Sequence, residues 1–227
     1  MKKLILLLSI LLPVAVSATT VSGTATAATT SGAWSNCNNP GSANWTSFAN
    51  IGATGTGSSV SMANTECDLT VGVSPVLTAS AFGVSIPGGS TINGVVVTFQ
   101  RWQNSTGGVN TLTTNEVFLC NGSTCGTVLG SKTGAGTAWP GVGSASTETY
   151  GTSSDTWGAT LTPAIINSSG FGFGLTVAAE TNGGQWTPNV NSATIAITFT
   201  TVSNVKHTVF WPAKFVTIKT KSTPKAS

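Results

Sequence analysis

The sequence predicts an all-β domain that folds as an antiparallel β-sandwich. Three observations support this fold class. From about Gly32 to Thr201 the chain consists of short apolar segments separated by Gly, Pro, Asn and Ser, as is typical of strands joined by turns. Three of these segments alternate apolar residues with small or polar ones at a period of two. No stretch carries an apolar stripe at helical spacing that is long enough for a long helix.

Residues 1–18 have the features of a secretory signal peptide. Lys2 and Lys3 precede the apolar run Leu4–Val16, and Val16-Ser17-Ala18 places small residues where a signal peptidase accepts them. The apolar run is shorter than the roughly 20 residues of a membrane-spanning helix. We therefore expect a mature chain that begins near Thr19, contains no integral membrane segment, and lies outside the cell or on its surface.

The rest of the chain divides into three parts. Residues 19–31 are mostly Thr, Ala, Gly and Ser, and they predict a flexible leader or a loosely attached edge strand. The sandwich is expected over residues 32–201, a length that suits one domain. Residues 202–227 are rich in Lys and carry "HTVFW" and "KFVTIK" around Pro212. This tail indicates either a terminal hairpin with a basic end or a segment that contacts an anionic surface.

The alternating segments are the strongest strand predictions. They are INGVVVTFQRW (92–102), FGFGLTVAAE (171–180) and SATIAITFTT (192–201). Their large apolar side chains each share one face: Val95, Val97 and Phe99; Phe171, Phe173, Leu175 and Val177; Ile195, Ile197 and Phe199. The opposite faces carry small or hydroxylated residues, as in a sheet that is packed on one side and wet on the other. Burial of the apolar faces, at roughly 25 cal/mol per Å², is the main stabilising force available.

Two connecting segments carry turn chemistry. In "LTPAIINSSG", Thr162 is placed as a helix N-cap and Pro163 occupies the first helical position, which predicts one short helical turn near 162–168. In "SIPGGST", a Pro-Gly turn leads into the strand that contains Val95. Gly83 and Gly94 flank this turn and are expected at bulges or at points of close packing.

These segments, taken in order, carry a family resemblance. FGVSIPGGSTINGVVVTFQR, LTPAIINSSGFGFGLTV and ATIAITFT resemble a loosely defined group of exported and phage-associated β-sandwich surface proteins. That group tends to read F-G-F-S-I-P-x-G-A-T-I-x-G-I, then T-x-x-D-I-N-x-x-x-F-G-V, and to end on an alternating strand. The resemblance covers roughly Val76 to Thr200. It implies a jelly-roll-like sandwich on a virion or cell surface, and it implies no catalytic residue. The chain departs from the group at Ile165-Ile166, where Asp is frequent.

The distribution of charge argues against a nucleic-acid partner. Charged residues make up 7% of the chain, against roughly 25% in average soluble proteins. Between Thr19 and Ser203 the basic residues are Arg101 and Lys132, and the acidic residues are Glu66, Asp68, Glu116, Glu148, Asp155 and Glu180. A mildly acidic domain lacks the clustered Lys and Arg that bind phosphates.

Four cysteines fit an oxidising compartment. Cys120 and Cys125 bracket Asn-Gly-Ser-Thr, a turn sequence, and a disulfide between them would close a tight hairpin. Cys37 and Cys67 would then pair with each other. The spacings do not match a zinc site, and the one histidine, His207, lies in the tail. We expect no metal and no cofactor.

Catalytic constellations are sparse. Glu66 and Asp68 are two residues apart and would share a face of a strand, where paired acids can divide acid and base roles. The simpler interpretation is two solvated acids at a sheet edge. His207 lies outside the patterned domain and far from any nucleophile elbow. We therefore expect no catalytic residue and no enzyme activity.

Binding is the functional class that the sequence favours. Trp102, Trp139 and Trp186 lie in or beside segments rich in Asn, Thr and Gly, and exposed Trp rings beside amides can form a platform for sugars. Packing is the more common role of such residues, above all for Trp34, Trp45 and Trp157. We expect a structural or adhesive surface protein that binds a partner or self-associates. The alternatives are a glycan-binding module that uses these Trp residues and a secreted glycan hydrolase.

Overall fold

The structure is a computed structural model. It describes residues 16–35, 44–62, 71–106, 111–122, 124–141, 143–180 and 185–202. Residues 1–15 and the tail from residue 203, which includes His207, lie outside these ranges. So do four residues named above: Cys37, Glu66, Cys67 and Asp68. Residues Ala15–Val202 form one compact unit.

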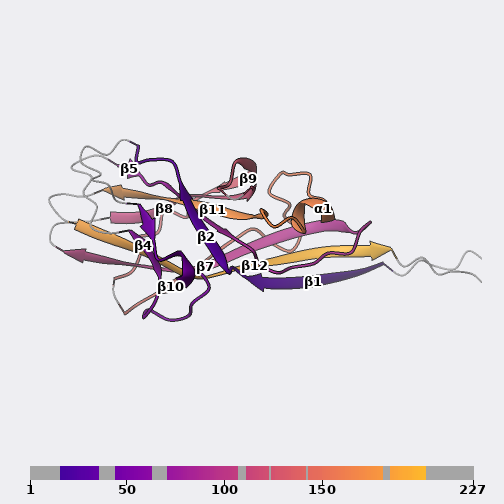
Figure 1. Ribbon diagram of the computed structural model, residues 1–227, viewed down its shortest axis with the longest axis horizontal. Coiled ribbons are helices and arrows are strands. Elements are labelled where there is room, and N and C mark those ends of the chain that lie inside the picture. The colour runs from indigo at the N-terminus through magenta and orange to yellow at the C-terminus, as the bar shows by residue number, and fades with distance from the viewer. Residues whose placement is uncertain are drawn as a thin grey trace, which may run out of the picture. The chain divides into compact units, whose positions relative to one another are not determined.

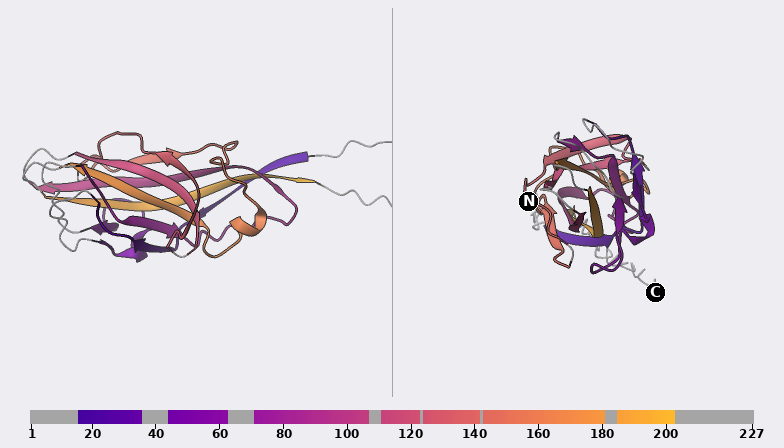
Figure 2. Two further views of the ribbon diagram at one scale, coloured as in Figure 1. Left: turned by 90° about the horizontal axis from the view of Figure 1, so that it is seen from above. Right: turned by 90° about the vertical axis from the view of Figure 1, so that its left-hand side faces the viewer.

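Two antiparallel sheets form this unit (Figure 1). The first has the order β10 (Ser146–Tyr150), β7 (Thr91–Thr106), β12 (Gln185–Val202), β4 (Val60–Met62) and β3 (Trp45–Thr46), and β1 (Val16–Thr24) also pairs with β12. The second has the order β2 (Ala27–Ser31), β6 (Val76–Ser80), β11 (Gly172–Glu180), β8 (Thr111–Asn121) and β9 (Thr127–Thr133), and β5 (Gly72–Val73) also pairs with β11. Figure 2 shows the two sheets from two further sides.

The strand order is that of a jelly roll. Going inward from the chain ends, β4 pairs with β12, β6 with β11, β7 with β10, and β8 with β9. These nested pairs alternate between the two sheets, as when one long hairpin is rolled into a double-layered sandwich. The predicted fold class is therefore confirmed, with β1, β2, β3 and β5 added around the eight strands.

The predicted apolar faces meet between the sheets. Val95, Val97 and Phe99 of β7 are fully buried, as are Phe173, Leu175 and Val177 of β11. The rings of Phe99 and Phe173 stack with their centroids 6.0 Å apart, and they join the two sheets. Because each buried aromatic ring removes 150–250 Å² or so from water, contacts of this kind supply most of the stability.

One face prediction was wrong. The second face of β11, expected to be wet, is also buried. A Cβ at Gly174 would lie 2.4 Å from the Phe118 ring, so glycine is needed for that ring to cover the strand. Phe118, Cys120 and Cys125 form a small apolar cluster of their own, to which partly buried Val76 adds.

The segment 19–31 forms strands. Its first part lies in β1, which runs antiparallel to β12 from the pair Val16↔Val202 to the pair Thr24↔Thr194, and its second part lies in β2 beside β6. Of the two forms expected for this segment, the structure has the edge strand. Figure 2 shows β1 and the end of β12 running side by side.

The helical turn and the bulge occur where the sequence places them. Helix α1 spans Pro163–Ile166, and the Thr162 side chain accepts a hydrogen bond from the Ile165 N–H at 3.3 Å. The β7–β12 register shifts beside Gly94, and Gly83 has a φ of 67°. The other helical segment is the 3₁₀ turn η1 (Phe48–Asn50). Within the described ranges, no helix is long and apolar enough to cross a membrane.

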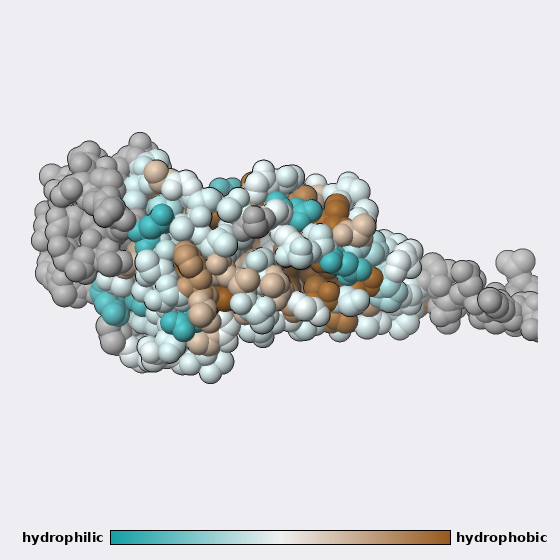
Figure 3. Space-filling model, in the orientation of Figure 1, coloured by the Kyte–Doolittle hydropathy of each residue, from teal (hydrophilic) through white to brown (hydrophobic). Residues whose placement is uncertain are grey.

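Much of the face shown in Figure 3 is pale, with several brown groups of apolar residues between the pale areas. Among the described residues the large hydrophobic side chains that are clearly exposed are Val16, Val71 and Val128. The surface therefore offers few charges and few large apolar side chains.

The contact between β6 and β11 yields a stability prediction. A Cβ at Gly172 would lie 2.0 Å from the Ala79 carbonyl oxygen, which is backbone and cannot move aside. We expect Gly172→Ala to lower the free energy of unfolding by roughly 3 kcal/mol. Gly126→Ala is the matched control, because a Cβ there meets nothing within 4 Å. Urea denaturation curves with equal midpoints for the two variants would contradict this packing.

Candidate functional site

The predicted tryptophan platform does not form from the described residues. Trp102 and Trp139 are each only 2% exposed, so neither presents a ring face to a sugar. Trp139 packs in the core and donates its indole N–H to Thr114 Oγ1 at 3.1 Å. Trp186 lies in β12, and its side chain is outside the described part of the structure. The expectation of exposed rings at Trp102 and Trp139 is therefore corrected to buried rings.

The other described tryptophans also pack. Trp45 and Trp157 are buried, and their indole N–H groups donate to the carbonyl oxygens of Pro75 and Val95 at 2.9 Å and 2.8 Å. Trp34 is half-buried against the same core. These residues pack in the apolar layer between the sheets. This is expected for large rings whose indole N–H donates to a backbone carbonyl.

A buried ion pair lies between the sheets. Arg101 of β7 and Glu148 of β10 are almost fully buried, and Arg101 Nε lies 2.7 Å from Glu148 Oε1. Arg101 also donates from its guanidinium to the Ala138 carbonyl at 3.2 Å, and it lies over the Trp139 ring at 5.6 Å from the centroid. A buried charge is tolerated only when it is paired and hydrogen-bonded in this way.

The second oxygen of Glu148 joins the two sheets through hydroxyl groups. Thr114 of β8 donates to Glu148 Oε2, and Tyr150 donates to the same atom at 3.0 Å. The Ala135 N–H donates in turn to the Tyr150 hydroxyl at 3.3 Å. The network therefore connects β7 and β10 of one sheet with β8 of the other and with the loop before β10.

This network stabilises the contact between the two sheets, and its carboxylate is not accessible to a substrate. Its carboxylate is occupied by Arg101, Thr114 and Tyr150 and is shielded from water. The sequence analysis assigned no role to Glu148. The alternation of the strand could have predicted the burial of Arg101. Residues two apart on a strand share a face, and Arg101 follows the inward-facing residues Val95, Val97 and Phe99 on β7.

Asp155 lies closer to the surface, in a second ion pair. Lys132 of β9 contacts Asp155 at 2.7 Å, and this hydrogen-bonded ammonium holds the pKa of the Asp155 carboxyl below its usual value. Such a partly exposed pair contributes little to stability. Lys132 Nζ also lies 5.6 Å from the Trp157 ring centroid. Within the described ranges, no three His, Cys, Asp or Glu residues gather in an arrangement that could hold a metal ion.

Cys120 and Cys125 are joined by a disulfide, with their Cα atoms 5.0 Å apart. Gly122 takes a φ of 97°, and the Cys125 N–H donates to the Gly122 carbonyl at 3.1 Å, so the hairpin turn has the backbone that Asn-Gly favours. The pairing of Cys37 with Cys67 falls outside the described residues.

Strand β1 is an open sheet edge. Among the described residues its one partner strand is β12, and all nine of its residues are exposed or half-buried. The strand reads VSATTVSGT and has neither charge nor proline. The other edges are shorter or protected: β2 and β10 have five residues each, β3 and β5 have two each, and β9 has Lys132 and a register shift in its pairing. Natural sheets use such devices to prevent edge pairing.

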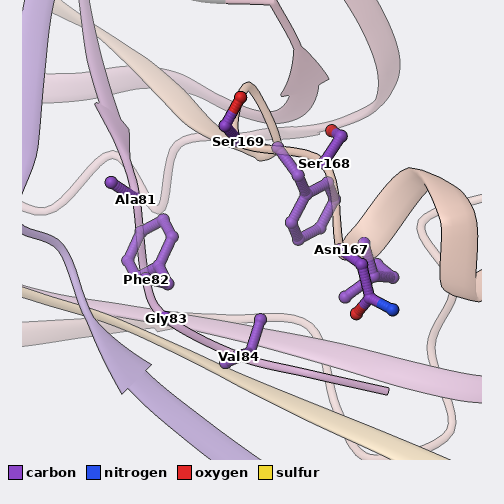
Figure 4. A pocket seen from close by; sticks show the side chains of 9 residues that line it. Ala81, Phe82, Gly83, Val84, Asn167, Ser168 and Ser169 are labelled. Carbon is purple, nitrogen blue, oxygen red and sulfur yellow. The ribbon is translucent and has the colours of Figure 1, made fainter. Parts of the chain in front are cut away.

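A pocket of about 150 Å³ lies between the segment after β6 and the segment after α1 (Figure 4). Ala81, Phe82, Gly83 and Val84 line one side, and Ile166, Asn167, Ser168, Ser169 and Phe171 line the rest. The sequence analysis predicted no residue of this pocket as a site.

Comparisons with known proteins assign no family. No family model matches the chain, and no curated protein matches it. Two solved structures match. One, described as "CBM4 structure and function", aligns at 10% identity and a TM-score of 0.28 over 56% of this chain and 81% of its own. The other, "Structure of infectious bursal disease virus Gx strain", aligns at 8% identity and a TM-score of 0.28 over 84% of this chain and 37% of its own. At these TM-scores neither indicates a function.

The buried ion pair yields a prediction by double-mutant cycle. Arg101→Met or Glu148→Gln alone leaves one buried group without its charged partner and is expected to cost about 3–5 kcal/mol of unfolding free energy. The double variant is expected to lose clearly less than the sum of the two, because it removes both charges. Urea denaturation of the four proteins measures this coupling. Strictly additive losses would show that the two side chains do not depend on each other.

Tyr150 yields a prediction on pH. Burial, followed by the charge of Glu148, raises the pKa of the Tyr150 phenol to about 12 from 10.0. The folded state therefore holds this proton more tightly than the unfolded state, so the contribution is complete below about pH 10 and is lost as the pH rises toward about 12. Tyr150 is the single tyrosine of the chain, so the ultraviolet absorbance of phenolate reports it alone. A midpoint near the ordinary value in folded protein would contradict its burial beside Glu148.

Proposed function

We propose that this protein is an exported structural or adhesive surface protein that self-associates through the open edge of β1 and has no enzymatic role. The observation that carries the proposal is that edge itself. Nine consecutive residues present one side of their backbone without a partner strand among the described residues. Free N–H and C=O groups in a row are a template for another strand.

The chemistry of β1 suits pairing with a second copy of itself. An antiparallel β1–β1 pair is two-fold symmetric, so a contact of residue i with residue j is repeated as a contact of j with i, and both copies use the same surface. The strand has no charged side chain, so the pair brings no like charges together. Its Thr and Val residues favour the extended conformation. The result would be one continuous sheet across two molecules.

Export is supported by the sequence of residues 1–18 and by the cysteine content. Cleavage after Ala18 would leave Thr19–Thr24 of β1 in the mature chain, and these residues pair with Phe199 through Thr194 of β12. The edge that remains is still six residues long, which is an ordinary strand length.

The alternatives have less support among the described residues. A glycan-binding module would need exposed Trp rings, and two of the three candidate rings, Trp102 and Trp139, are buried. A glycan hydrolase would need two accessible acids in one cleft. Glu148 is sealed in the ion pair with Arg101, and Asp155 is held by Lys132.

The proposal is tested by placing charge on the edge. Ser22 and Thr24 are exposed in β1, so Ser22→Lys/Thr24→Lys adds two positive charges without disturbing the core. We expect sedimentation velocity to show dimers or larger assemblies of the mature protein, and at least about tenfold weaker association of the variant.

The control adds the same charge to another edge. Thr127→Lys/Ser131→Lys modifies two exposed residues of β9 and should leave association unchanged. A parent protein that stays monomeric at every concentration would refute self-association. Equal weakening by both pairs of substitutions would show that net charge and not the β1 edge controls it.

A further inference from the structure

The pocket opens where two neighbouring strands separate. β6 and β11 pair from Leu77↔Leu175 to Ser80↔Gly172, and the pairing ends there. On one side the chain continues through residues 81–85 as an irregular segment. On the other, the chain before Gly172 is folded into a turn in which the Phe171 N–H donates to the Ser168 carbonyl at 3.1 Å. The pocket of about 150 Å³ occupies the gap between the two segments (Figure 4).

The interior of the pocket is apolar and uncharged. Phe82, Ile166 and Phe171 line it and are at most 6% exposed, so they form fixed walls. Figure 4 shows Phe82 and Val84 on one side and the segment Asn167–Ser169 on the other. None of the nine lining residues is charged. An engineered apolar cavity of about the same volume takes up a benzene molecule, so the space suits one apolar side chain.

Two of the three polar side chains that line the pocket, Asn167 and Ser168, are already occupied. Asn167 accepts from the Ile86 N–H and donates to the Ile86 carbonyl, both at 2.8 Å. Ser168 donates its hydroxyl to Asn121 Oδ1 at 2.8 Å. These bonds hold the two walls at a fixed separation. They also leave no free amide to bind the hydroxyl groups of a sugar, which argues against a glycan as the occupant.

The backbone on one wall is free. Ala81 and Gly83 have positive φ values, 57° and 67°, and these values end the ladder of β6. Within the described residues, the backbone N–H and C=O groups of Gly83, Val84 and Ser85 have no hydrogen-bond partner in the protein. Gly83 and Ser85 are exposed, and Val84 is half-buried. Free backbone groups beside an apolar pocket match a main chain that carries an apolar side chain.

We propose that this pocket binds an extended peptide segment, which hydrogen-bonds its main chain to the backbone of Gly83–Ser85 and inserts one uncharged apolar side chain between Phe82 and Phe171. Backbone pairing supplies affinity that is independent of sequence, and the pocket selects the side chain by size and by lack of charge. Phe82 and Val84 pack beside Gly23 of β1, but the proposed contacts with the peptide include no residue of that strand and do not require self-association.

The test is a titration of the full-length mature chain followed by ¹⁵N–¹H correlation spectra. The Ser22→Lys/Thr24→Lys background keeps self-association out of the measurement. The probe is acetyl-Thr-Ser-Leu-Ser-Thr-amide, and the comparison peptide has Ala in place of Leu. We expect the Leu peptide to shift the amide signals of Phe82–Ser85 and Asn167–Phe171, and the Ala peptide to bind at least about tenfold more weakly.

Variants locate the site. Val84→Phe fills the pocket from one wall and Ser169→Phe from the other, and each is expected to weaken binding at least about tenfold. Ala164→Phe adds the same ring to an exposed residue of α1 that does not line the pocket, and it should bind as the parent does. Two filling variants are used so that the test survives if one of them fails to fold, which its spectrum would reveal.

Three outcomes would overturn the proposal. The first is no shift at Phe82–Ser85 at millimolar peptide. The second is equal binding of the Leu and Ala peptides. The third is unchanged binding when the amide of the Leu residue is N-methylated, because the pocket would then take an apolar group alone, without a main chain. A failure here leaves the assembly test on β1 unaffected, since the two sites share no residue.

Discussion

The structure depends on the apolar layer between its two sheets, because the chain has almost no other means of stabilisation. Charged residues are 7% of the sequence, and among the described residues the ion pairs are Arg101–Glu148 and Lys132–Asp155. The contact of Phe99 with Phe173 joins β7 to β11 at the centre of this layer. Each buried ring or aliphatic side chain contributes about 1.5–3 kcal/mol relative to exposure, and many of them act together.

The order of the strands determines where the layer is incomplete. β12, the last strand of the described residues, lies inside the first sheet, with β7 on one side and both β1 and β4 on the other. β4 has three residues and covers only the pairs at Asn189 and Val190, so β1 must cover the rest of that side. An edge is left open as a result. In the second sheet, β6 and β11 separate after Ser80 and Gly172, and a pocket remains there. Both proposed interactions arise at these two gaps.

Much of the fold was predictable because its signals are local. The period of two in INGVVVTFQRW identified the buried face of β7, and Thr162-Pro163 identified the start of α1. The Asn-Gly turn between Cys120 and Cys125 indicated their disulfide. Each of these depends on residues within about ten positions of one another.

What was not predictable depends on residues that are far apart in the chain. Arg101 and Glu148 are brought together by the pairing of β7 with β10, and the sequence around each residue gives no indication of its partner. Trp139 sits in a loop sequence of the kind that surrounds exposed aromatics, yet it is buried because Thr114 and Arg101 approach it from β8 and β7. The pocket is a consequence of where two strands part.

The most direct test of the account is amide hydrogen exchange of the mature protein at a low and a high concentration. The apolar layer predicts that the amides of β7, β11 and the central part of β12 exchange slowest at both concentrations. The open edge predicts that the amides of Thr19–Thr24 that point away from β12 exchange quickly when the protein is dilute and become protected when it is concentrated. Equal exchange of β1 at the two concentrations, or slowest exchange outside β7, β11 and β12, would contradict the account.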